Sequence, residues 1–328
     1  MKKLLKYLLI LTAIQSNAQE LNLPVFTQYL ADNDFVVSPT FAGIGDNFRI
    51  RANGLTQWVG IKDAPQNMAL YADIRMANRS GVGVSAYKDE NGYTRQQGLK
   101  ISYAHHLILD YKTEQYLSFG ISYNLNSFRI DIENFRGTYD IPIVDPTITD
   151  DRAISNNNFD VGALYRKKDY WLSFNANNIL QKNVDSFDGI EPNSLLNLQV
   201  YSGYMIKSKN YSVIEPSVYY QLFMSDKRSS TDINLKYRKF NRDNDFYWIG
   251  ASYRFLNDQI MTPLNIGPMA GVKKSIFYFS YAYQITINDL SGFNSGTHAI
   301  TIGFDLLQEL SDCPCTEGKY KLGNRLWQ

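Results

Sequence analysis

Apolar and small polar residues alternate strictly in the stretch Leu117-Ser118-Phe119-Gly120-Ile121-Ser122-Tyr123-Asn124-Leu125. Successive side chains of a β-strand point to opposite faces, so one face of this stretch is apolar and the other is small and polar. The same division runs from Phe277 to Ile287, and weaker copies lie at 67–74 and 247–255. A soluble β-sandwich would carry charged residues on its outer face, whereas Gly, Ser, Asn and Gln dominate the polar face here. This pattern is typical of a barrel whose apolar face contacts lipid and whose polar face lines a lumen.

Fourteen such segments follow one another along the chain, and single-chain outer-membrane barrels have an even number of strands. The connections after even-numbered segments are mostly short, while the two longest, 128–157 and 180–195, follow odd-numbered ones. We therefore predict an all-β protein, a transmembrane antiparallel β-barrel of about 14 strands over residues 48–307. Both termini are expected in the periplasm and the long loops outside. The predicted strands are 48–58, 67–77, 80–88, 94–107, 115–127, 158–166, 169–179, 196–207, 210–222, 230–239, 245–256, 262–273, 275–288 and 297–307.

The charge balance excludes one class of function. The chain has 328 residues, and its 33 Lys and Arg balance 32 Asp and Glu, a net charge of +1. Binding of nucleic acid through bulk charge is therefore not expected, because no basic excess exists to neutralise phosphates. The 24 Tyr and 18 Phe against only 2 Cys suit an all-β protein with aromatic side chains on pleated surfaces or in interfacial belts.

Residues 1–18 have the pattern of a secretory signal peptide. Three lysines among the first six residues precede an apolar run over 7–14, and small residues at 16–18 supply a cleavage site, so we expect the mature chain to begin at Gln19. A transmembrane anchor is the alternative, but the apolar run is too short to cross about 30 Å of hydrocarbon. Export together with a barrel predicts a multi-pass protein of the cell outer membrane, in contact with outer-membrane lipid.

Two segments flank the predicted barrel. Residues 19–47 are too apolar for a free linker, so we expect them to form a plug in or under the lumen. Residues 308–328 form a polar, basic tail on the periplasmic side, which either docks a periplasmic partner or has no fixed structure. Cys313 and Cys315 lie in this tail. An oxidising compartment permits a disulfide, local or intermolecular, while metal or redox chemistry and inert thiols are the alternatives.

Catalytic chemistry is not indicated. We expect the protein not to be an enzyme, and we predict no cofactor and no metal site. The adjacent residues His105 and His106 point to opposite faces of a strand and cannot bind one metal ion together. A lipid-facing Ser and His pair would need a Ser beside His105 or His298 on a neighbouring strand, which the sequence alone does not place. The acidic loop at 145–151 lacks the spacing of a dedicated calcium loop.

Short motifs spread over most of the chain resemble the PorP/SprF family, outer-membrane proteins of the type IX secretion system. No single motif is specific, but their order is. Ser38 stands where the family usually has Asn, Ala299 stands where a Glu commonly follows the His, and the tail with two cysteines is a further departure. In chain order the motifs are Phe26-Thr27-Gln28-Tyr29, Ser38-Pro39-Thr40-Phe41-Ala42-Gly43, Gln57-Trp58-Val59-Gly60 with Ala64-Pro65, Gly81-Val82-Gly83-Val84 with Asp89 and Asn91-Gly92, Leu117-Ser118-Phe119-Gly120, Trp248 to Arg254, Tyr281-Ala282-Tyr283, and Asp289-Leu290-Ser291 followed by Asn294-Ser295-Gly296-Thr297-His298.

Two of these motifs are expected to meet. We predict Trp58 at the top of the first strand and His298 at the start of the last, and these strands are neighbours where a barrel closes. The alternative is a Trp of the aromatic belt and a loop His, neither with a special role, and a first outer loop that Ala64 and Pro65 merely shape. The motif residues singled out are Gln57, Trp58, Gly60, Ala64, Pro65, Ser295, Gly296, Thr297 and His298.

The resemblance implies a non-enzymatic role in type IX secretion and gliding motility. Such a barrel holds a secreted cell-surface adhesin by the adhesin's C-terminal sorting domain. The tail would then contact periplasmic type IX secretion components or peptidoglycan-associated components. The alternative from another class is a gated channel or transporter for a small or hydrophobic solute. We expect the outer loops to bind the sorting domain, and the candidate residues for adaptable contacts are Phe128, Phe135, Tyr139, Asn156, Asn157, Asn158 and Phe187.

Overall fold

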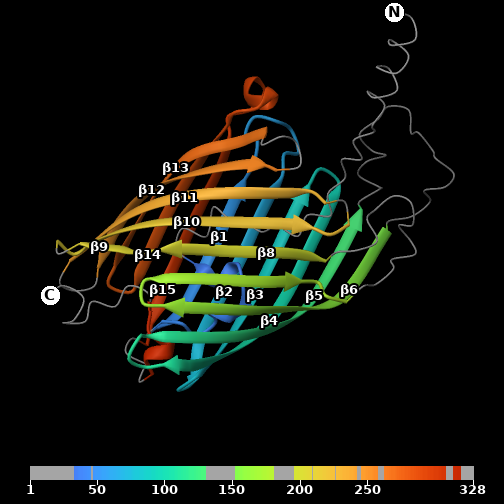
Figure 1. Ribbon diagram of the computed structural model, residues 1–328. Coiled ribbons are helices and arrows are strands. Elements are labelled where there is room, and N and C mark those ends of the chain that lie inside the picture. The colour runs from blue at the N-terminus through green and yellow to red at the C-terminus, as the bar shows by residue number, and fades with distance from the viewer. Residues whose placement is uncertain are drawn as a thin grey trace, which may run out of the picture.

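Antiparallel strands form one sheet that closes on itself into a barrel (Figure 1). The computed structural model describes residues 33–45, 47–130, 152–180, 196–208, 210–225, 227–241, 245–257, 262–307 and 313–318. Within these ranges β8 (Asn197–Tyr204) and β9 (Ile206–Ser208) both pair with β10 (Ser212–Phe223), so they are two parts of one strand of the wall. The fifteen labelled strands therefore make a barrel of fourteen, which confirms the predicted number and fold class.

The other strands follow one another around the wall in chain order, and the first strand pairs with the last. β1 pairs with β15 from Phe48 opposite Leu306 to Thr56 opposite His298, which confirms the predicted closure. Their bounds are β1 Phe48–Thr56, β2 Gln66–Ala77, β3 Ser80–Asn91, β4 Thr94–Asp110, β5 Gln115–Ile130, β6 Arg152–Lys167, β7 Tyr170–Asn177, β11 Ser229–Phe240, β12 Phe246–Leu256, β13 Thr262–Lys274, β14 Phe277–Thr286 and β15 Thr297–Leu306.

The two ends of the barrel differ in their connections. At the end where β1 begins and β15 ends, short segments such as 78–79, 168–169 and 275–276 join the strands, and we call this the turn end. The opposite end, which we call the loop end, carries the connections 57–65, 131–151, 178–196 and 287–296. In outer-membrane barrels the short turns face the periplasm and the long loops face outward.

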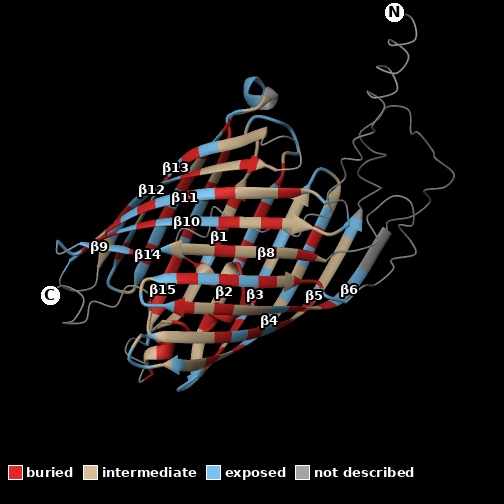
Figure 2. Cartoon of the chain, viewed as in Figure 1, coloured by how far each residue is buried: buried red, intermediate tan, exposed pale blue. Residues whose placement is uncertain are grey.

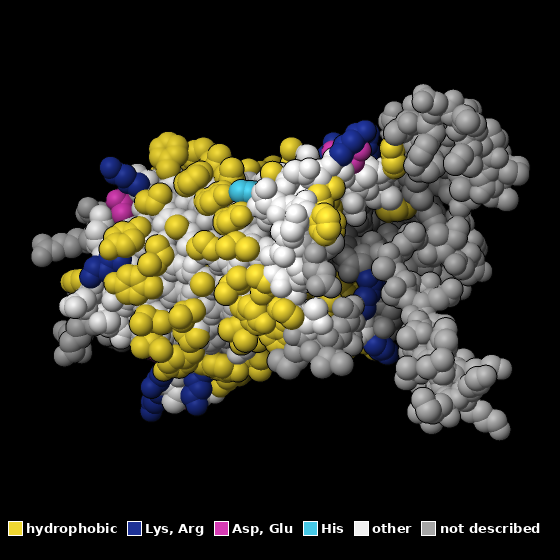
Figure 3. Space-filling model, turned by 90° about the horizontal axis from the view of Figure 1, so that it is seen from above, with side chains coloured by type: hydrophobic (Ala, Val, Ile, Leu, Met, Phe, Trp, Pro, Cys, Tyr) yellow, Lys and Arg dark blue, Asp and Glu magenta, His cyan; other side chains and the backbone are white. Residues whose placement is uncertain are grey.

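Buried and more exposed residues alternate along the strands of the wall (Figure 2). On β15, Ile300 and Ile302 are exposed on the outer face, while Thr301 between them is buried on the lumen side. Apolar side chains accordingly cover the middle of the outer surface, and Lys and Arg gather toward its ends (Figure 3). An apolar outer face is compatible with the hydrocarbon of a membrane. The closed sheet is compatible with it as well, because its strands pair their backbone N–H and C=O groups with each other. In the described ranges no helix has the length and apolar character to cross a membrane.

Several predicted strand boundaries were wrong by two or three residues, and the largest error is the start of β6. β5 reaches Ile130 and β6 already begins at Arg152, so the loop expected at 128–157 is shorter. The stretch 155–158 is polar on both faces and gives no alternation signal. Its extended conformation comes instead from pairing with β5, as in the pair of Asn126 with Asn156. The start of a strand that forms only because a neighbouring strand pairs with it cannot be predicted from the residues of that strand alone.

Candidate functional site

The lumen holds the segment of chain that precedes β1. Residues 33–45 contain two short 3-10 helices, η2 (Asp34–Val36) and η3 (Pro39–Phe41), and η3 lies against β4, β5 and β6. This segment is seen in blue behind the front strands in Figure 1, and we call residues 33–45 the plug segment. Phe35 and Phe41 are only 5% and 2% exposed. The first part of the plug predicted over 19–47 lies outside the described residues.

Inward-facing glycines of the wall make room for the plug segment. They are Gly81 and Gly83 on β3, Gly120 on β5 and Gly162 on β6. A Cβ atom at Gly81 would lie 2.6 Å from the Cα of Gly43, and one at Gly120 would lie 2.6 Å from the backbone nitrogen of Thr40. Ordinary carbon contacts need about 3.5 Å or more, so larger residues at these positions would displace the plug segment.

Aromatic side chains of the wall complete this seat. Phe41 of the plug segment packs against Tyr201 on β8 with ring centroids 6.2 Å apart, and Tyr201 in turn packs against Trp171 on β7 at 5.9 Å. The hydroxyl of Tyr201 also donates to the carboxylate of Asp34 at 3.1 Å. Burial of each large apolar side chain contributes about 1.5–3 kcal/mol. The aromatic side chains of Trp171 and Tyr201 therefore lie on the lumen side of the wall, where Tyr201 contacts the plug segment.

Asp73 on β2 joins the plug segment to the wall. One oxygen of its buried carboxylate accepts a hydrogen bond from the backbone N–H of Gly43 at 3.0 Å. The same carboxylate pairs with the guanidinium of Arg49 on β1, at 2.7 Å for the closest atoms. A buried carboxylate is stable only when it is paired and hydrogen-bonded. The plug segment thus supplies one of the donors that Asp73 needs.

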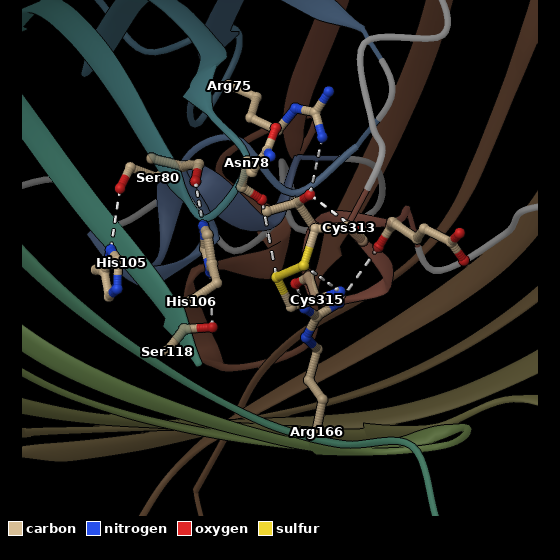
Figure 4. The surroundings of a disulfide bond; sticks show 12 residues. Arg75, Asn78, Ser80, His105, His106, Ser118, Arg166, Cys313 and Cys315 are labelled. Carbon is tan, nitrogen blue, oxygen red and sulfur yellow. Dashed lines mark hydrogen bonds between the residues drawn. A yellow bond between two sulfur atoms is a disulfide. The ribbon is translucent and has the colours of Figure 1, made fainter. Parts of the chain in front are cut away.

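His106 on β4 contacts both the plug segment and Ser118, and Figure 4 shows its ring beside Ser118. Its Nε2 lies 3.0 Å from the carbonyl oxygen of Ala42 and donates to it, because a carbonyl only accepts. Its Nδ1 lies 2.8 Å from the hydroxyl oxygen of Ser118 on β5. His106 is completely buried, so its ring bridges the plug segment and two strands inside the lumen.

The neighbouring His105 faces outward, which confirms the predicted opposite orientations of the two histidines. Its Nδ1 lies 3.0 Å from the hydroxyl oxygen of Ser80 on β3, the neighbour that the sequence alone could not place. The same hydroxyl lies 3.0 Å from the hydroxyl of Tyr103, so these residues form a polar cluster on the outer face near the turn end. Among the described residues, no group of three or more His, Cys, Asp and Glu side chains is arranged to hold a metal ion.

Charged side chains elsewhere in the lumen form ion pairs between strands. Four such pairs join a basic and an acidic side chain on the lumen side of the wall. Because the two charges of each pair are opposite, the pairs do not produce a strong electric field of one sign in the lumen. The pairs are Arg51 with Asp305 at 2.8 Å, Lys100 with Asp160 at 2.6 Å, Lys236 with Glu215 at 3.3 Å and Arg254 with Asp232 at 2.6 Å.

At the loop end, two connections are bonded to each other. The N–H of Val59 donates to the carbonyl oxygen of Gly296 at 3.1 Å, and the N–H of Ser295 donates to the carbonyl oxygen of Val59 at 2.8 Å. We call residues 57–65 and 287–296 the joined loops. The two predicted motifs therefore do meet where the barrel closes. These two bonds between them join backbone atoms. Trp58 was predicted inside the first strand, but β1 ends at Thr56 and Trp58 lies in the loop that follows.

The shape of the joined loops depends on a few backbone positions. Trp58 and Gly60 have positive φ angles of 47° and 103°, and Gly296 has a φ of 84°. The N–H of Gln57 donates to the carbonyl oxygen of Pro65 at 2.9 Å, which closes the first of the joined loops on itself. Ala64 precedes this Pro in the same loop. Such a cross-bonded pair of loops has less freedom than two separate loops of the same length.

His298 stands two residues after the second of the joined loops. It pairs with Thr56 at the start of β15 and lies on the outer face, whereas Thr297 before it is buried. Its Nδ1 lies 2.6 Å from the hydroxyl of Tyr281, and its ring centroid lies 4.8 Å from that of Tyr283. Two tyrosines and a histidine at this level are typical of the aromatic belt at a membrane surface.

The candidate cargo-binding residues are separated by the structure. Phe128 lies in β5 and Asn156, Asn157 and Asn158 lie in β6, so these four are wall residues and not loop residues as expected. Asn158 is buried, and its side chain donates to the carbonyl oxygen of Leu180 at 3.1 Å. Asn157 is exposed. The remaining candidates, Phe135, Tyr139 and Phe187, fall outside the described residues.

The C-terminal cysteines are joined to each other. Cys313 and Cys315 form a disulfide beside η6 (Pro314–Thr316), close to the turn end (Figure 4). The surrounding contacts come from β2 and β6 and from the plug segment. The tail predicted over 308–328 is described only at 313–318, and there it is packed against the barrel.

Sequence reasoning missed the residues that seat the plug segment. Asp73 and His106 appear in the sequence as isolated polar residues, and their partners in the plug segment lie far away along the chain. One local signal was present: Gly81 and Gly83 put two glycines on the same face of a strand, which suggests close approach of another backbone. The sequence could not show which backbone approaches.

A comparison with protein families matches residues 18–304 to the family described as type IX secretion system membrane protein PorP/SprF. A comparison with curated proteins gave no match. Among solved structures the chain is similar to the CymD monoaromatic hydrocarbon channel, with a TM-score of 0.45 and 11% identity over 87% of this chain and 92% of that one. It is also similar to BamA from Haemophilus ducreyi lacking POTRA domains 1–3, with a TM-score of 0.39 and 8% identity over 79% and 70%. A third is outer membrane phospholipase A from Escherichia coli, with a TM-score of 0.36 and 9% identity over 86% and 96%.

Proposed function

Because the chain belongs to the PorP/SprF family of type IX secretion system membrane proteins and is an outer-membrane β-barrel, we propose that it binds and anchors a secreted cell-surface adhesin. The adhesin binds at the loop end through its C-terminal sorting domain. Periplasmic type IX secretion or peptidoglycan-associated components bind at the turn end, through the part of the tail that follows residue 318. The barrel itself needs no catalytic group for either task.

The difference between the two barrel ends supports this proposal most. The turn end has tight connections, and the plug segment lies in the lumen against β4, β5 and β6. The loop end has the long connections 131–151 and 178–196 together with the joined loops. A barrel that passes solutes by diffusion needs an open lumen, whereas a barrel that holds another protein needs a large surface at one end.

The joined loops offer a firm contact for that protein. Phe293 is 75% exposed and Ile61 is 40% exposed, and both lie in loops that are bonded to each other. An exposed aromatic side chain on an ordered backbone loses little entropy when it is buried by a partner, which is why such residues dominate binding energy at interfaces. We therefore place Phe293 in the contact with the sorting domain, next to the longer loops.

The test removes loop residues without touching the paired wall. Deletion of residues 133–149 leaves the pairing of Ile130 with Arg152 available to close a short hairpin. The expected result is that the adhesin leaves the cell surface and appears in the medium, while the barrel still shows heat-dependent migration on a gel. Retention of the adhesin at the wild-type level by a folded barrel would overturn the proposal.

A matched pair of substitutions locates the contact. Phe293→Ser at the loop end and Leu307→Ser at the turn end both remove an exposed apolar side chain, since Leu307 is 61% exposed. Adhesin retention should fall for Phe293→Ser and remain unchanged for Leu307→Ser. Equal retention by both variants contradicts the place given to Phe293. Solute conductance by the wild-type protein in planar bilayers would instead support the channel alternative.

A further inference from the structure

The six described residues of the C-terminal tail lie beneath the plug segment, at the turn end of the lumen. We propose that this short turn, residues 313–318, is a lid that locks the plug segment inside the barrel, and that the disulfide between Cys313 and Cys315 keeps the lid in its closed shape. We call these residues the lid. This inference concerns the closure of the lumen and does not depend on the identity of any cargo.

The lid is fixed to the wall on two sides (Figure 4). The guanidinium of Arg166 on β6 donates to the carbonyl oxygen of Cys315 and, at 3.3 Å, to that of Glu317. Arg75 on β2 donates to the hydroxyl of Thr316 at 3.4 Å. The sulfur of Cys315 lies 3.9 Å from the carbonyl oxygen of Asn78, in the turn between β2 and β3. The lid therefore spans the lumen between strands that are not neighbours in the wall.

The lid also binds the plug segment directly. The backbone N–H of Gly45 donates to the carbonyl oxygen of Thr316 at 2.9 Å. Gly45 is the last residue of the plug segment, so this bond joins the lid to the end of the plug segment that is nearest to β1 in the chain. Cys315 and Thr316 are completely buried. A segment that only docked other proteins would keep such residues accessible.

Arg166 explains why the lid stays in place. This side chain is 8% exposed and stands over the ring of Tyr116 at 5.4 Å. A buried guanidinium needs acceptors to offset the loss of its hydration. Two carbonyl oxygens of the lid serve as acceptors, so removal of the lid leaves this charge with fewer partners. The wall thus favours the closed lid, and the closed lid favours the seated plug segment.

The disulfide prepares the lid for these contacts. The carbonyl oxygen of Cys313 accepts two hydrogen bonds from Thr316, one from its backbone N–H at 3.0 Å and one from its hydroxyl at 3.1 Å. These bonds close a tight turn. A covalent bond across the turn removes alternative conformations of the unseated tail, so less entropy is lost when the lid binds. The seated lid in turn buries both sulfur-bearing residues, and a reducing thiolate must reach a sulfur atom to attack it.

The experiment compares two truncations of the full-length protein in detergent or lipid. Removal of residues 319–328 keeps the lid, and removal of residues 308–328 takes it away. The readouts are hydrogen exchange of the peptide 33–45 and conductance in planar bilayers, with heat-dependent migration on a gel as the control for folding. We expect a protected peptide and no conductance for wild type and for the shorter truncation. The longer truncation should lose protection over 33–45 and conduct.

Two further variants test the parts of the lid. Cys313→Ser combined with Cys315→Ser should lose part of the protection over 33–45. Arg166→Gln should make the disulfide of the folded protein reducible by dithiothreitol at a concentration that leaves wild type oxidised. If the peptide 33–45 stays as protected as in wild type when the lid is removed from a folded barrel, the lid does not lock the plug segment and the proposal is wrong. Equal reducibility of wild type and Arg166→Gln overturns the role of Arg166.

Discussion

The close contact between the plug segment and the glycines of the wall can be tested by adding one methyl group at Gly81. Gly81→Ala places a Cβ atom 2.6 Å from the Cα of Gly43 and still closer to the carbonyl oxygen of Ala42. Both neighbours are backbone atoms, which cannot rotate away as a flexible side chain would. The plug segment must therefore move by about 1 Å to restore an ordinary carbon contact of about 3.5 Å.

The magnitude follows from the contacts that this movement breaks. Overpacking by a methyl group costs about 1–3 kcal/mol, and a shift of about 1 Å also lengthens the 3.0 Å bond between His106 and Ala42 beyond the range of a hydrogen bond. Since about 1.4 kcal/mol is a factor of ten, the population of barrels with an unseated plug segment should rise about fivefold to about 150-fold.

Limited chymotrypsin digestion measures that population. Phe35 and Phe41 are buried in the seated state and become substrates only when the plug segment leaves the lumen. When opening and closing are fast, the cleavage rate follows the open population, so Gly81→Ala should be cut at these two residues faster by the factor above. Gly54→Ala is the control, because a Cβ atom there meets nothing within 4 Å. Equal cleavage rates for wild type, Gly54→Ala and Gly81→Ala would refute the reasoning.

Three further predictions concern the wall and the joined loops. Asp73→Ala leaves Arg49 without its ion-pair partner and should destabilise the barrel by about 1–3 kcal/mol, measured as a lower midpoint of heat-dependent gel migration, whereas Asp73→Asn should lose less because it keeps an acceptor. Ile302→Arg puts a charge on the lipid face and should cost about 2–4 kcal/mol near the bilayer midplane; an unchanged urea midpoint in lipid vesicles would contradict the assignment of this face. Gly296→Ala forces a side chain into a left-handed conformation at about 1–2 kcal/mol, so exchange of the Val59 amide should quicken about fivefold to about 30-fold, and unchanged exchange would show that the joined loops do not need this glycine.

The wall of the barrel was predictable because it follows from a local property. Side chains of a strand alternate, so stretches such as 117–125 show both the strand and its two faces without knowledge of any neighbour. The number of strands, the pairing of the first strand with the last and the unequal ends of the barrel follow from counting such stretches. The largest failure is the start of β6, which lies at Arg152 and not at 158, and it arises because polar residues on both faces of 155–158 remove the alternation.

The interior was not predictable in the same way. The sequence alone determined a fourteen-stranded barrel with an apolar outer face, and it marked the motifs at Gln57 and Ser295 that meet at the loop end. Only the tertiary structure decided that Gly81, Asp73 and Arg166 hold the plug segment and the lid. Alternation needs information from adjacent residues only, whereas the seated plug segment depends on contacts between residues far apart in the chain, such as Gly45 and Thr316. Those contacts exist only once the barrel has closed around them.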